Sequence, residues 1–386
     1  MQITDSSFRL QLVVFFLVSA SFANIYITQP VLPLLQDEFG VDLVVVSLTV
    51  SFVILGMTLS NLPFGVLADR VSIRPLVLIG SCMVAAGGII CSLTDSISLL
   101  VLARLFQGLF IPALTTCLAA WLAKSLPAHR LNVVMGSYVS ATVIGGLVGR
   151  LLGGWMYWRY AFVAAAVVII SAGVLAFRNL PASEGDRTNS YQEVGFIELL
   201  SSGRLMLIYL CSAGSFAIFS SIFNFLPFRL HGEPFNFSTG LTTLLYLVYI
   251  SGIFMGPISG KISDRLGTGF TLLAGSTIFG ISLIMILQPL ISTVVVGLVG
   301  VCAGFFTIHS AAVGYLNRQL TTGHGRANAL YVLFYYLGGW LGITVSGFSY
   351  QAGGWSMLIY GCIALLIIPL STGYIVHGEK EISLLK

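Results

Sequence analysis

The chain has 386 residues, of which 57% are hydrophobic and only 8% are charged, and its mean hydropathy is +0.97. Because a soluble domain carries roughly 25% charged residues, this composition excludes a soluble globular protein and indicates one that resides in a lipid bilayer. The net charge of +4 comes from basic residues scattered over many short segments, so it does not indicate a nucleic-acid partner.

Twelve apolar stretches each approach the ~20 residues that a helix needs to cross a bilayer. A helix satisfies its own backbone hydrogen bonds in lipid, so we predict an all-α membrane protein with twelve transmembrane helices. The predicted spans are 10–34, 43–66, 76–94, 97–121, 131–153, 160–178, 205–229, 240–259, 270–289, 293–316, 327–349 and 355–376.

Basic residues are distributed unevenly over the segments that join these helices. Most of the 18 Lys and Arg residues fall on the side of the membrane that holds the N-terminus, and such a bias marks the cytoplasmic side. We therefore expect a multi-pass protein of the cell (inner) membrane with both termini in the cytoplasm. The six cysteines lie in apolar stretches without a C-x-x-C pair, so we expect no metal site and no cofactor.

One charged loop occurs twice in the chain. Gly65–Arg74 and Gly260–Gly269 both contain Gly, an aliphatic residue, Asp and Arg at the same offsets, which indicates an internal repeat. We predict two pseudo-symmetric six-helix bundles, residues 1–178 and 204–386. A polar cytoplasmic linker, 179–203, joins them and carries a short interfacial helix at Phe196–Leu200.

Three motifs in order along the chain resemble the major facilitator superfamily and, within it, the twelve-helix drug:proton antiporter group. Gly65–Arg74 is similar to the family's G-x-L-a-D-R-x-G-R-K loop, with Ser72 and Ile73 as departures, and Arg104–Gly108 fits R-x-x-Q-G. The fifth helix fits G-x8-G-x3-G-P-x2-G-G at every glycine, with Arg150 in place of the proline; these glycines are Gly136, Gly145, Gly149, Gly153 and Gly154. The resemblance implies a monomeric secondary transporter that works by alternating access, and the helix 5 pattern implies export.

The resemblance also implies a conformational latch built from the repeated loop. Its residues are Asp69, Arg70 and Arg74 in the first half and Asp264 and Arg265 in the second half. An acid at the end of a helix can pair with a cation or cap a neighbouring helix. The alternative is that these charges only set the topology and the tight turn.

Three glycines recur every four residues on the fifth predicted helix, at Gly145, Gly149 and Gly153. This spacing places them on one face and permits close approach of another helix. We expect this face to pack against the eleventh predicted helix, where Gly338 and Gly342 lie, so that the halves rock there. Plain close packing would produce the same spacing.

Arg104 and Arg150 lie inside predicted helices, whereas all 14 acidic residues lie in loops or at helix ends. A guanidinium in hydrocarbon costs at least ~2.5–3.5 kcal/mol, so both arginines should face a cavity or a partner. Their charge favours an anionic, zwitterionic or neutral substrate over a cation. Alternatively, Arg104 is structural and bonds carbonyls of the first helix. The acids Asp37, Glu38 and Asp95 could also pair with Arg104 or serve as the proton-sensing groups.

His309 lies inside the tenth predicted helix and can change charge near neutral pH, which makes it a candidate proton site or, alternatively, a hydrogen-bonded core residue. Further candidates for substrate binding are aromatic and amide side chains on helices expected to line a cavity. They are Tyr26, Gln29, Gln107, Tyr138, Asn224, Phe225, Tyr246, Tyr249, Tyr335, Tyr336 and Trp340.

Two transport hypotheses follow from these residues. One is a proton-coupled exporter of a small organic compound, and the other is a carrier or symporter for an organic anion such as a carboxylate metabolite or a metal chelator. The chain contains no H-E-x-x-H, G-x-S-x-G or G-x4-G-K-[ST] motif, which argues against an enzyme and against ATP as the energy source. The expected partners are a small-molecule substrate, protons and the bilayer.

Overall fold

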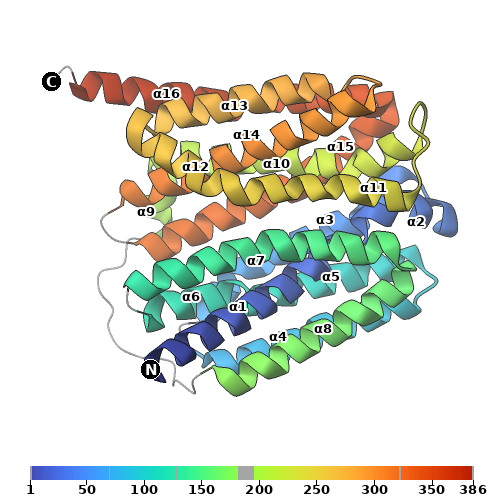
Figure 1. Cartoon of the computed structure of the whole chain (residues 1–386), viewed down its shortest axis with the longest axis horizontal. Helices are drawn as coiled ribbons and strands as arrows, with labels where there is room; N and C mark the ends of the chain where they lie inside the picture. The colour runs from blue at the N-terminus through green and yellow to red at the C-terminus, as the bar shows by residue number, and fades with distance from the viewer. Residues whose placement is uncertain (1, 69, 127, 181–194, 321–322, 385–386) are drawn as a thin grey trace. The chain divides into compact units, whose positions relative to one another are not determined.

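The structure, a computed structural model, describes residues 2–68, 70–126, 128–180, 195–320 and 323–384, with only the backbone for 2–7, 128–133 and 379–384. These residues form helices joined by short turns, without a β-strand in the described ranges (Figure 1). The helices are α1 (Gln2–Tyr26), η1 (Gln29–Val31), α2 (Leu32–Phe39), α3 (Leu43–Leu67), α4 (Ile73–Leu93), α5 (Ile97–Leu114), α6 (Thr116–Ser125), α7 (Ala128–Trp155), α8 (Trp158–Asn179), α9 (Phe196–Ser201), α10 (Gly203–His231), α11 (Thr239–Leu245), η2 (Tyr246–Tyr249), α12 (Ile250–Leu266), α13 (Thr268–Met285), α14 (Ile291–Arg318), α15 (His324–Leu365) and α16 (Ile367–Leu384).

Eleven helical segments of the described residues are long and apolar enough to cross a membrane. The last of them, His324–Gly378, is 55 residues long and is interrupted by non-helical backbone at Gly353 and Gly354. Gly354 has a φ of 65°, a conformation that only glycine adopts readily, so two spans meet at this point. The twelve predicted spans and the all-α membrane fold are confirmed.

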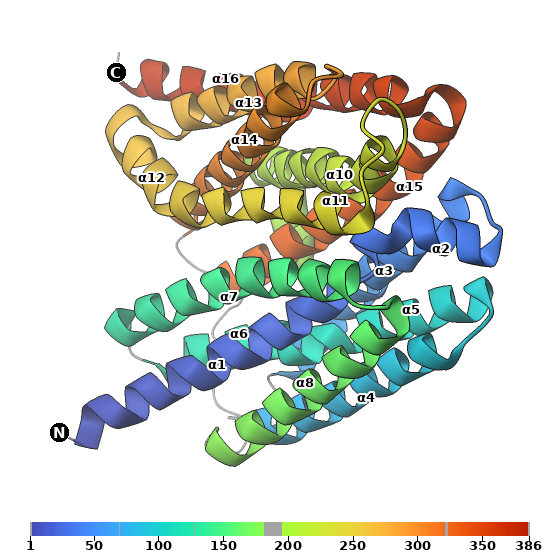
Figure 2. The same cartoon turned by 45° about the vertical axis from the view of Figure 1, so that its right-hand side comes forward.

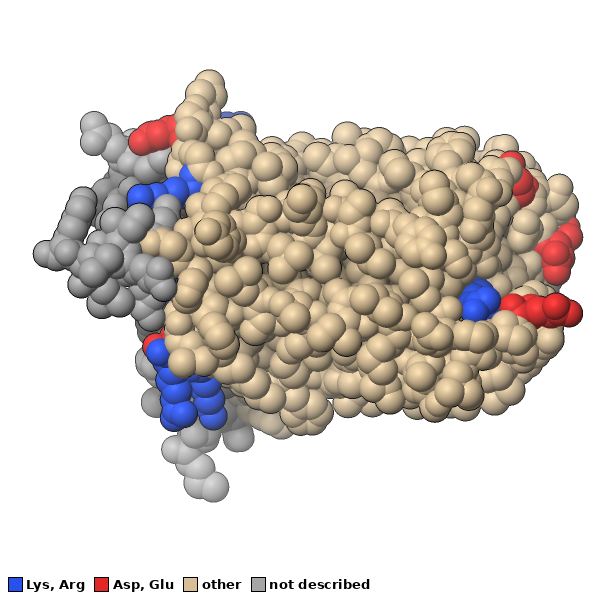
Figure 3. All heavy atoms as spheres, turned by 90° about the horizontal axis from the view of Figure 1, so that it is seen from above, with Lys and Arg blue, Asp and Glu red and all other residues tan. Residues whose placement is uncertain are grey.

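Charged side chains are confined to the ends of these spans on the visible surface. In Figure 3 the Lys, Arg, Asp and Glu side chains of the described residues lie towards the helix ends, and the surface between them is uncharged. This distribution suits the hydrocarbon core of a bilayer, where an exposed charge is expensive.

The chain divides into two compact units. Unit 1 comprises Met1–Asn189 and Thr239–Tyr246, and unit 2 comprises Ser190–Ser238 and Leu247–Lys386. The segment Thr239–Tyr246 thus groups with unit 1, although it lies within the predicted second half. The greater part of the predicted linker lies outside the described residues, and the short helix predicted at its end is α9.

In unit 1 the first membrane span is broken. α1 ends at Tyr26, Pro30 lies inside the short helix η1, and α2 ends at Phe39, followed by the capping residue Gly40, whose φ is 59°. The side chain of Asp42 then caps α3 by accepting a hydrogen bond from the backbone N–H of Val45 at 2.9 Å. The break leaves the carbonyl end of α1 inside the bundle.

Close helix pairs build each unit. In unit 1, α1 runs beside α7 and α4 runs beside α8 in both views (Figures 1 and 2). In unit 2, α10 packs against α15, and α13 packs against α14 and α16. Gly338 and Gly342 of α15 contact the backbone of Ala213 and Ala217 on α10.

The prediction that the helix 5 glycines pack against the eleventh helix is wrong. A Cβ placed at Gly145, Gly149 or Gly153 would lie within 2.3 Å of a carbonyl oxygen of Ser19, Ala23 or Ile27 respectively. These contacts are all with α1 or the turn that follows it. The face is used for close packing inside unit 1, because only glycine lets the two helix backbones approach so closely.

We predict that Gly149→Ala destabilises unit 1. The added methyl group would meet the Ala23 carbonyl oxygen at 2.1 Å, and such overpacking costs about 1–3 kcal/mol. The measurement is thermal unfolding of the purified protein in detergent. Gly136→Ala on the same helix is the matched control, because no atom lies within 4 Å of a Cβ there. Equal melting temperatures for the two variants would contradict the proposed contact.

Candidate functional site

Arg104 on α5 is fully buried and is held by neutral oxygen atoms. Its Nε donates to the Thr49 carbonyl at 2.9 Å. Its Nη1 donates to the Asn24 carbonyl at 2.7 Å and to Oε1 of Gln107 at 2.6 Å. Its Nη2 donates to the Ile25 carbonyl at 2.5 Å. Four of the five N–H donors of a guanidinium are therefore occupied within the protein.

These contacts place Arg104 at the broken end of α1. The carbonyls of Asn24 and Ile25 belong to the last turn before the break at Tyr26, where carbonyls lack an intrahelical partner, and a cation is favourable at a helix C-terminus. Gln107 continues the network by donating from Nε2 to the Val84 carbonyl of α4 at 2.9 Å. The geometry supports the structural interpretation of Arg104, which bonds carbonyls of the first helix.

Arg150 on α7 is 1% exposed and lies among side chains from other helices. Its Nε donates to Oε1 of Gln29 at 2.7 Å, and its Nη1 donates to the Gly146 carbonyl of its own helix at 2.8 Å. The guanidinium carbon lies 4.0 Å from the ring centroid of Tyr26 and 5.2 Å from that of Tyr246. The amide, the carbonyl and the two rings in these contacts are all neutral groups.

The segment that carries Tyr246 is attached to α7 by two more contacts. The Trp155 indole N–H donates to the Gly240 carbonyl at 3.3 Å. A Cβ at Gly154 would lie 1.8 Å from the hydroxyl of Thr243, so glycine is required for α11 to approach. These contacts bring a second aromatic ring to Arg150 from a distant part of the sequence.

Arg159 forms an ion-pair cluster at the start of α8. Its Nη2 lies 3.3 Å from a Glu38 oxygen and 2.8 Å from an Asp95 oxygen, and its guanidinium lies over the Trp158 ring. The Trp158 indole N–H donates to the other Glu38 oxygen at 2.7 Å. The alternative that Glu38 or Asp95 pairs with Arg104 is wrong, because Arg159 engages both acids at the end of the bundle.

In unit 2 an aromatic cluster surrounds His309 of α14. Its Nδ1 lies 3.0 Å from the phenol oxygen of Tyr331 on α15, and its ring stacks on Phe305 with centroids 5.9 Å apart. Phe305 contacts Phe216 of α10, which stacks on Tyr335 with centroids 3.7 Å apart. Among the described residues, His309 thus contacts the Tyr331 phenol and the rings of Phe305 and Tyr335.

The other candidates of unit 2 are distributed around this cluster. Tyr249 contacts the Phe223 ring with centroids 4.5 Å apart, and Tyr336 lies edge-on to Phe216. Trp340 follows Gly338 by two residues, so it lies on the opposite side of α15 from the face that contacts α10. Phe225 packs on Tyr350 and so belongs to a different contact.

Asn224 of α10 is fully buried, and neither its Nδ2 nor its Oδ1 has a hydrogen-bond partner among the described residues. Burial of a polar group without a partner costs about 1–3 kcal/mol in proteins. This cost makes Asn224 the least satisfied of the sequence-predicted site residues that the structure describes in unit 2.

Tyr138 lies apart from both arginines. Its phenol lies near Thr115, at the break between α5 and α6. The structure therefore brings together Arg150, Gln29 and Tyr26, brings Arg104 to Gln107, and leaves Tyr138 in a contact of its own.

A sequence model of the Major Facilitator Superfamily matches residues 14–317, which is most of the chain. The chain belongs to this superfamily. It is a multi-pass membrane transporter.

Transporters from two bacteria are similar to this chain over most of its length. The chain is 26% identical over 372 residues to the MFS-type transporter YybF of Bacillus subtilis, with 93% of this chain and 91% of that protein covered. It is 26% identical over 382 residues to the inner membrane transport protein YnfM of Escherichia coli, with 97% and 92% covered.

Solved structures of the superfamily share the fold. A bacterial homolog of the human lysosomal transporter Spinster, in an inward-facing and unoccupied conformation, superimposes with a TM-score of 0.79 at 13% identity over 96% of this chain and 97% of that chain. The human organic anion transporter MFSD10 (TETRAN) gives 0.72 at 16% identity, with 95% and 99% covered. At these identities the likeness concerns the fold alone.

The superfamily's loop motif in unit 1 is described in part. Asp69 lies outside the described residues. Arg70 is exposed in the turn before α4, and the Nε of Arg74 donates to the Leu180 carbonyl at the end of α8. Arg74 therefore ties the start of α4 to the end of the bundle.

In unit 2 an acidic residue of the repeated loop pairs with an arginine that lies outside the loop. Asp264 lies 3.8 Å from Nη1 of Arg318 on α14, and Nη2 of Arg318 donates to the Thr268 hydroxyl at 2.6 Å. Arg265 is exposed beside them. The sequence offers one signal for Arg318. It is a basic residue directly after the uninterrupted apolar stretch of the tenth predicted span, 293–316.

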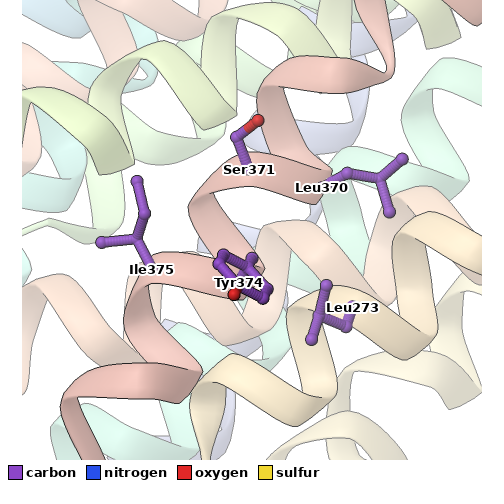
Figure 4. Close-up of a pocket in the computed structure, with 5 residues that line it drawn as sticks. All are labelled: Leu273, Leu370, Ser371, Tyr374 and Ile375. Carbon is purple, nitrogen blue, oxygen red and sulfur yellow. The ribbon is translucent and has the colours of Figure 1, made fainter.

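Two grooves open on unit 2. One, of about 500 Å³, is lined by four apolar or aromatic side chains and one hydroxyl of α13 and α16, at Leu273, Leu370, Ser371, Tyr374 and Ile375 (Figure 4). The other, of about 440 Å³, adjoins the Asp264–Arg318 pair. In the described part of the chain, no group of three His, Cys, Asp or Glu side chains could hold a metal ion. Neither groove adjoins Arg150.

We predict that Arg104→Gln lowers the thermal stability of the protein. The variant removes three donors to carbonyl oxygens of α1 and α3, and each hydrogen bond to a charged group contributes about 1.5–3 kcal/mol. Thermal unfolding in detergent measures the effect. Arg178→Gln, which removes an exposed arginine of α8, is the control. Our interpretation of Arg104 would be refuted if the two variants unfolded at the same temperature.

Proposed function

We propose that the protein is a secondary active exporter of small amphipathic organic compounds. It works by proton antiport through alternating access and favours anionic, zwitterionic or neutral substrates. The observation that supports this preference best is the buried Arg150 guanidinium, positioned by Gln29 and flanked by the rings of Tyr26 and Tyr246. Aromatic rings beside a fixed positive charge suit an apolar molecule that carries a carboxylate.

The electrostatics of the helices disfavour cations. The acids in described ion pairs, Glu38, Asp95 and Asp264, are engaged by Arg159 and Arg318 at the ends of helices. A lipophilic cation that reached Arg150 would meet a like charge in surroundings of low dielectric constant, where repulsion is strong. The same field attracts an anion.

The glycine pattern of α7 supports export, because it is similar to the pattern of drug:proton antiporters within the superfamily. Every glycine of that pattern is present, while Arg150 replaces its proline. The chain has no nucleotide-binding motif, which favours an ion gradient as the energy source. His309, whose Nδ1 lies 3.0 Å from the Tyr331 phenol oxygen, is the proposed proton-binding residue.

The second candidate function is a carrier or symporter for an organic anion. It is favoured by the same buried arginine, and the human organic anion transporter MFSD10 has the same fold. Reconstituted vesicles with the pH gradient imposed in each direction separate the two mechanisms. Antiport drives substrate towards the acidic side, and symport drives it towards the alkaline side.

Two further proposals concern the protein's place in the cell. We propose that it resides in the inner membrane with both termini in the cytoplasm and functions as a monomer. The Asp264–Arg318 pair and Arg70, Arg74 and Arg265 then lie on the cytoplasmic side as parts of a latch. Asp264 is largely exposed, so the pair contributes little stability and can open at low cost.

Arg150→Gln is expected to reduce transport of naphthaleneacetate at least tenfold, mainly through a higher KM, because one charge-assisted contact is worth about 1.5–3 kcal/mol. Transport of the neutral naphthaleneacetamide should change less. The measurement is uptake into proteoliposomes driven by a pH gradient.

Arg178→Gln controls for the loss of one positive charge. Gln29→Glu is a sharper variant, since it would place a carboxylate at the position from which Gln29 now bonds Arg150 at 2.7 Å. It should abolish naphthaleneacetate transport while leaving the protein folded. Unchanged naphthaleneacetate transport in both Arg150→Gln and Gln29→Glu would eliminate Arg150 as the anion-binding residue.

His309→Asn is expected to uncouple transport from protons. The variant keeps a polar side chain beside Tyr331 but removes the imidazole, which is the proposed proton-binding group. Uptake driven by a pH gradient should fall to the level seen without a gradient, whereas exchange of internal for external substrate should persist. Tyr331→Phe, which removes only the phenol contact at 3.0 Å, should retain partial coupling. Full gradient-driven uptake by His309→Asn would place the proton site elsewhere.

A further inference from the structure

Asn224 differs from the other buried amide side chains in the described part of the chain. Four other Asn and Gln side chains are buried there, and each makes at least one side-chain hydrogen bond: Asn24, Gln29, Asn61 and Gln107. Asn224 is 0% exposed, and both of its polar atoms lack a partner. A buried amide without hydrogen bonds is rare in native proteins, so its presence at this position needs an explanation.

The neighbouring polar groups of α10 do not supply a partner. The hydroxyl of Ser220 donates to the Gly339 carbonyl at 3.3 Å, and the hydroxyl of Ser221 donates to the Ala217 carbonyl at 2.6 Å. Ser221 in turn accepts from Ser346 at 2.9 Å. Ser220 and Ser221 are one turn before Asn224 on α10, and their hydroxyls bond backbone carbonyls and, for Ser221, the Ser346 hydroxyl of α15.

Leucine has the same number of side-chain heavy atoms as asparagine, branched in the same way, and carries no amide. An amide at this position is accounted for if another molecule supplies its hydrogen bonds. The adjacent residue Phe223 packs on Tyr249 and Phe219, so buried aromatic rings lie one residue along α10 from the amide. A molecule bound here would combine an aromatic group with a polar one.

We propose that Asn224 is a substrate-binding residue that recognises an amide-like group. Its Oδ1 can accept from an N–H while its Nδ2 donates to the adjacent carbonyl, so the complementary ligand presents a donor beside an acceptor. The substrate class is thereby narrowed to aromatic acids or neutral compounds that carry an amide. This inference rests on the proposed transport function but does not depend on Arg150.

The first arm of the test measures thermal unfolding of the protein without substrate. Asn224→Leu should unfold at the same or a higher temperature than the wild type, because it replaces an unsatisfied buried amide by an apolar group with the same branching and number of heavy atoms. Asn61→Leu is the matched control. Asn61 is buried and accepts a hydrogen bond from Thr116 at 2.6 Å, so its replacement should lower the unfolding temperature.

The second arm compares transport of hippurate with that of benzoylpropionate, which has the same length and differs by a methylene in place of the amide N–H. Wild-type protein should prefer hippurate, and Asn224→Leu should lose about tenfold in hippurate transport relative to benzoylpropionate, the effect of about one hydrogen bond. Asn61→Leu should not alter the ratio.

Three outcomes would overturn the inference. A destabilised Asn224→Leu variant would show that the amide is paired within the folded protein. If Asn224→Leu left the ratio of hippurate transport to benzoylpropionate transport unchanged, Asn224 would not be the residue that recognises the amide. Transport of naphthaleneacetate but of neither hippurate nor benzoylpropionate would exclude amide-bearing aromatic compounds as the substrate class. Absence of transport of any organic compound would instead refute the proposed function itself.

Discussion

A guanidinium buried at membrane depth must find oxygen atoms or aromatic rings inside the protein, because hydrocarbon offers neither. Unit 1 meets this requirement at one place, the broken end of α1. Arg104 reaches this end from α5 and bonds the carbonyls of Asn24 and Ile25. The break leaves these carbonyls without an intrahelical hydrogen bond, and Arg104 supplies the missing donors.

The glycines of α7 bring the second arginine to the same place. Gly149 and Gly153 contact the backbone at Ala23 and Ile27, which are the residues on either side of the end of α1. Because the backbones touch there, Arg150 lies close enough to stack on Tyr26 and to bond Gln29. The motif glycines of α7 thus position the Arg150 guanidinium as well as the helix itself.

The two arginines differ in how readily their contacts can be exchanged. Arg104 is bonded mainly to backbone carbonyls, which cannot move without unfolding a helix. The contacts of Arg150 include the Gln29 side-chain amide and the Tyr26 ring face, which can change rotamer without unfolding a helix. This difference supports the structural interpretation of Arg104 and the proposed substrate-binding role of Arg150, although the sequence places both residues inside apolar spans.

The sequence predicts the spans and the repeat well, because length and hydropathy alone determine what can cross a bilayer. It does not predict which helices touch, since nearly every face of these helices is apolar and the periodicity that identifies a buried face is weak. The partner of the α7 glycines, the pairing of Arg159 with Glu38 and Asp95, and the attachment of α11 to α7 all depend on such contacts. The unpaired state of Asn224 is likewise visible only once its neighbours are known.

The central claim is that the transporter selects substrates by charge. The most direct test is to compare three compounds with one aromatic group in wild-type proteoliposomes under the same pH gradient, naphthaleneacetate, naphthaleneacetamide and naphthylethylamine. The account predicts that the carboxylate and the amide are transported and that the amine is not. Transport of naphthylethylamine in preference to naphthaleneacetate would contradict it.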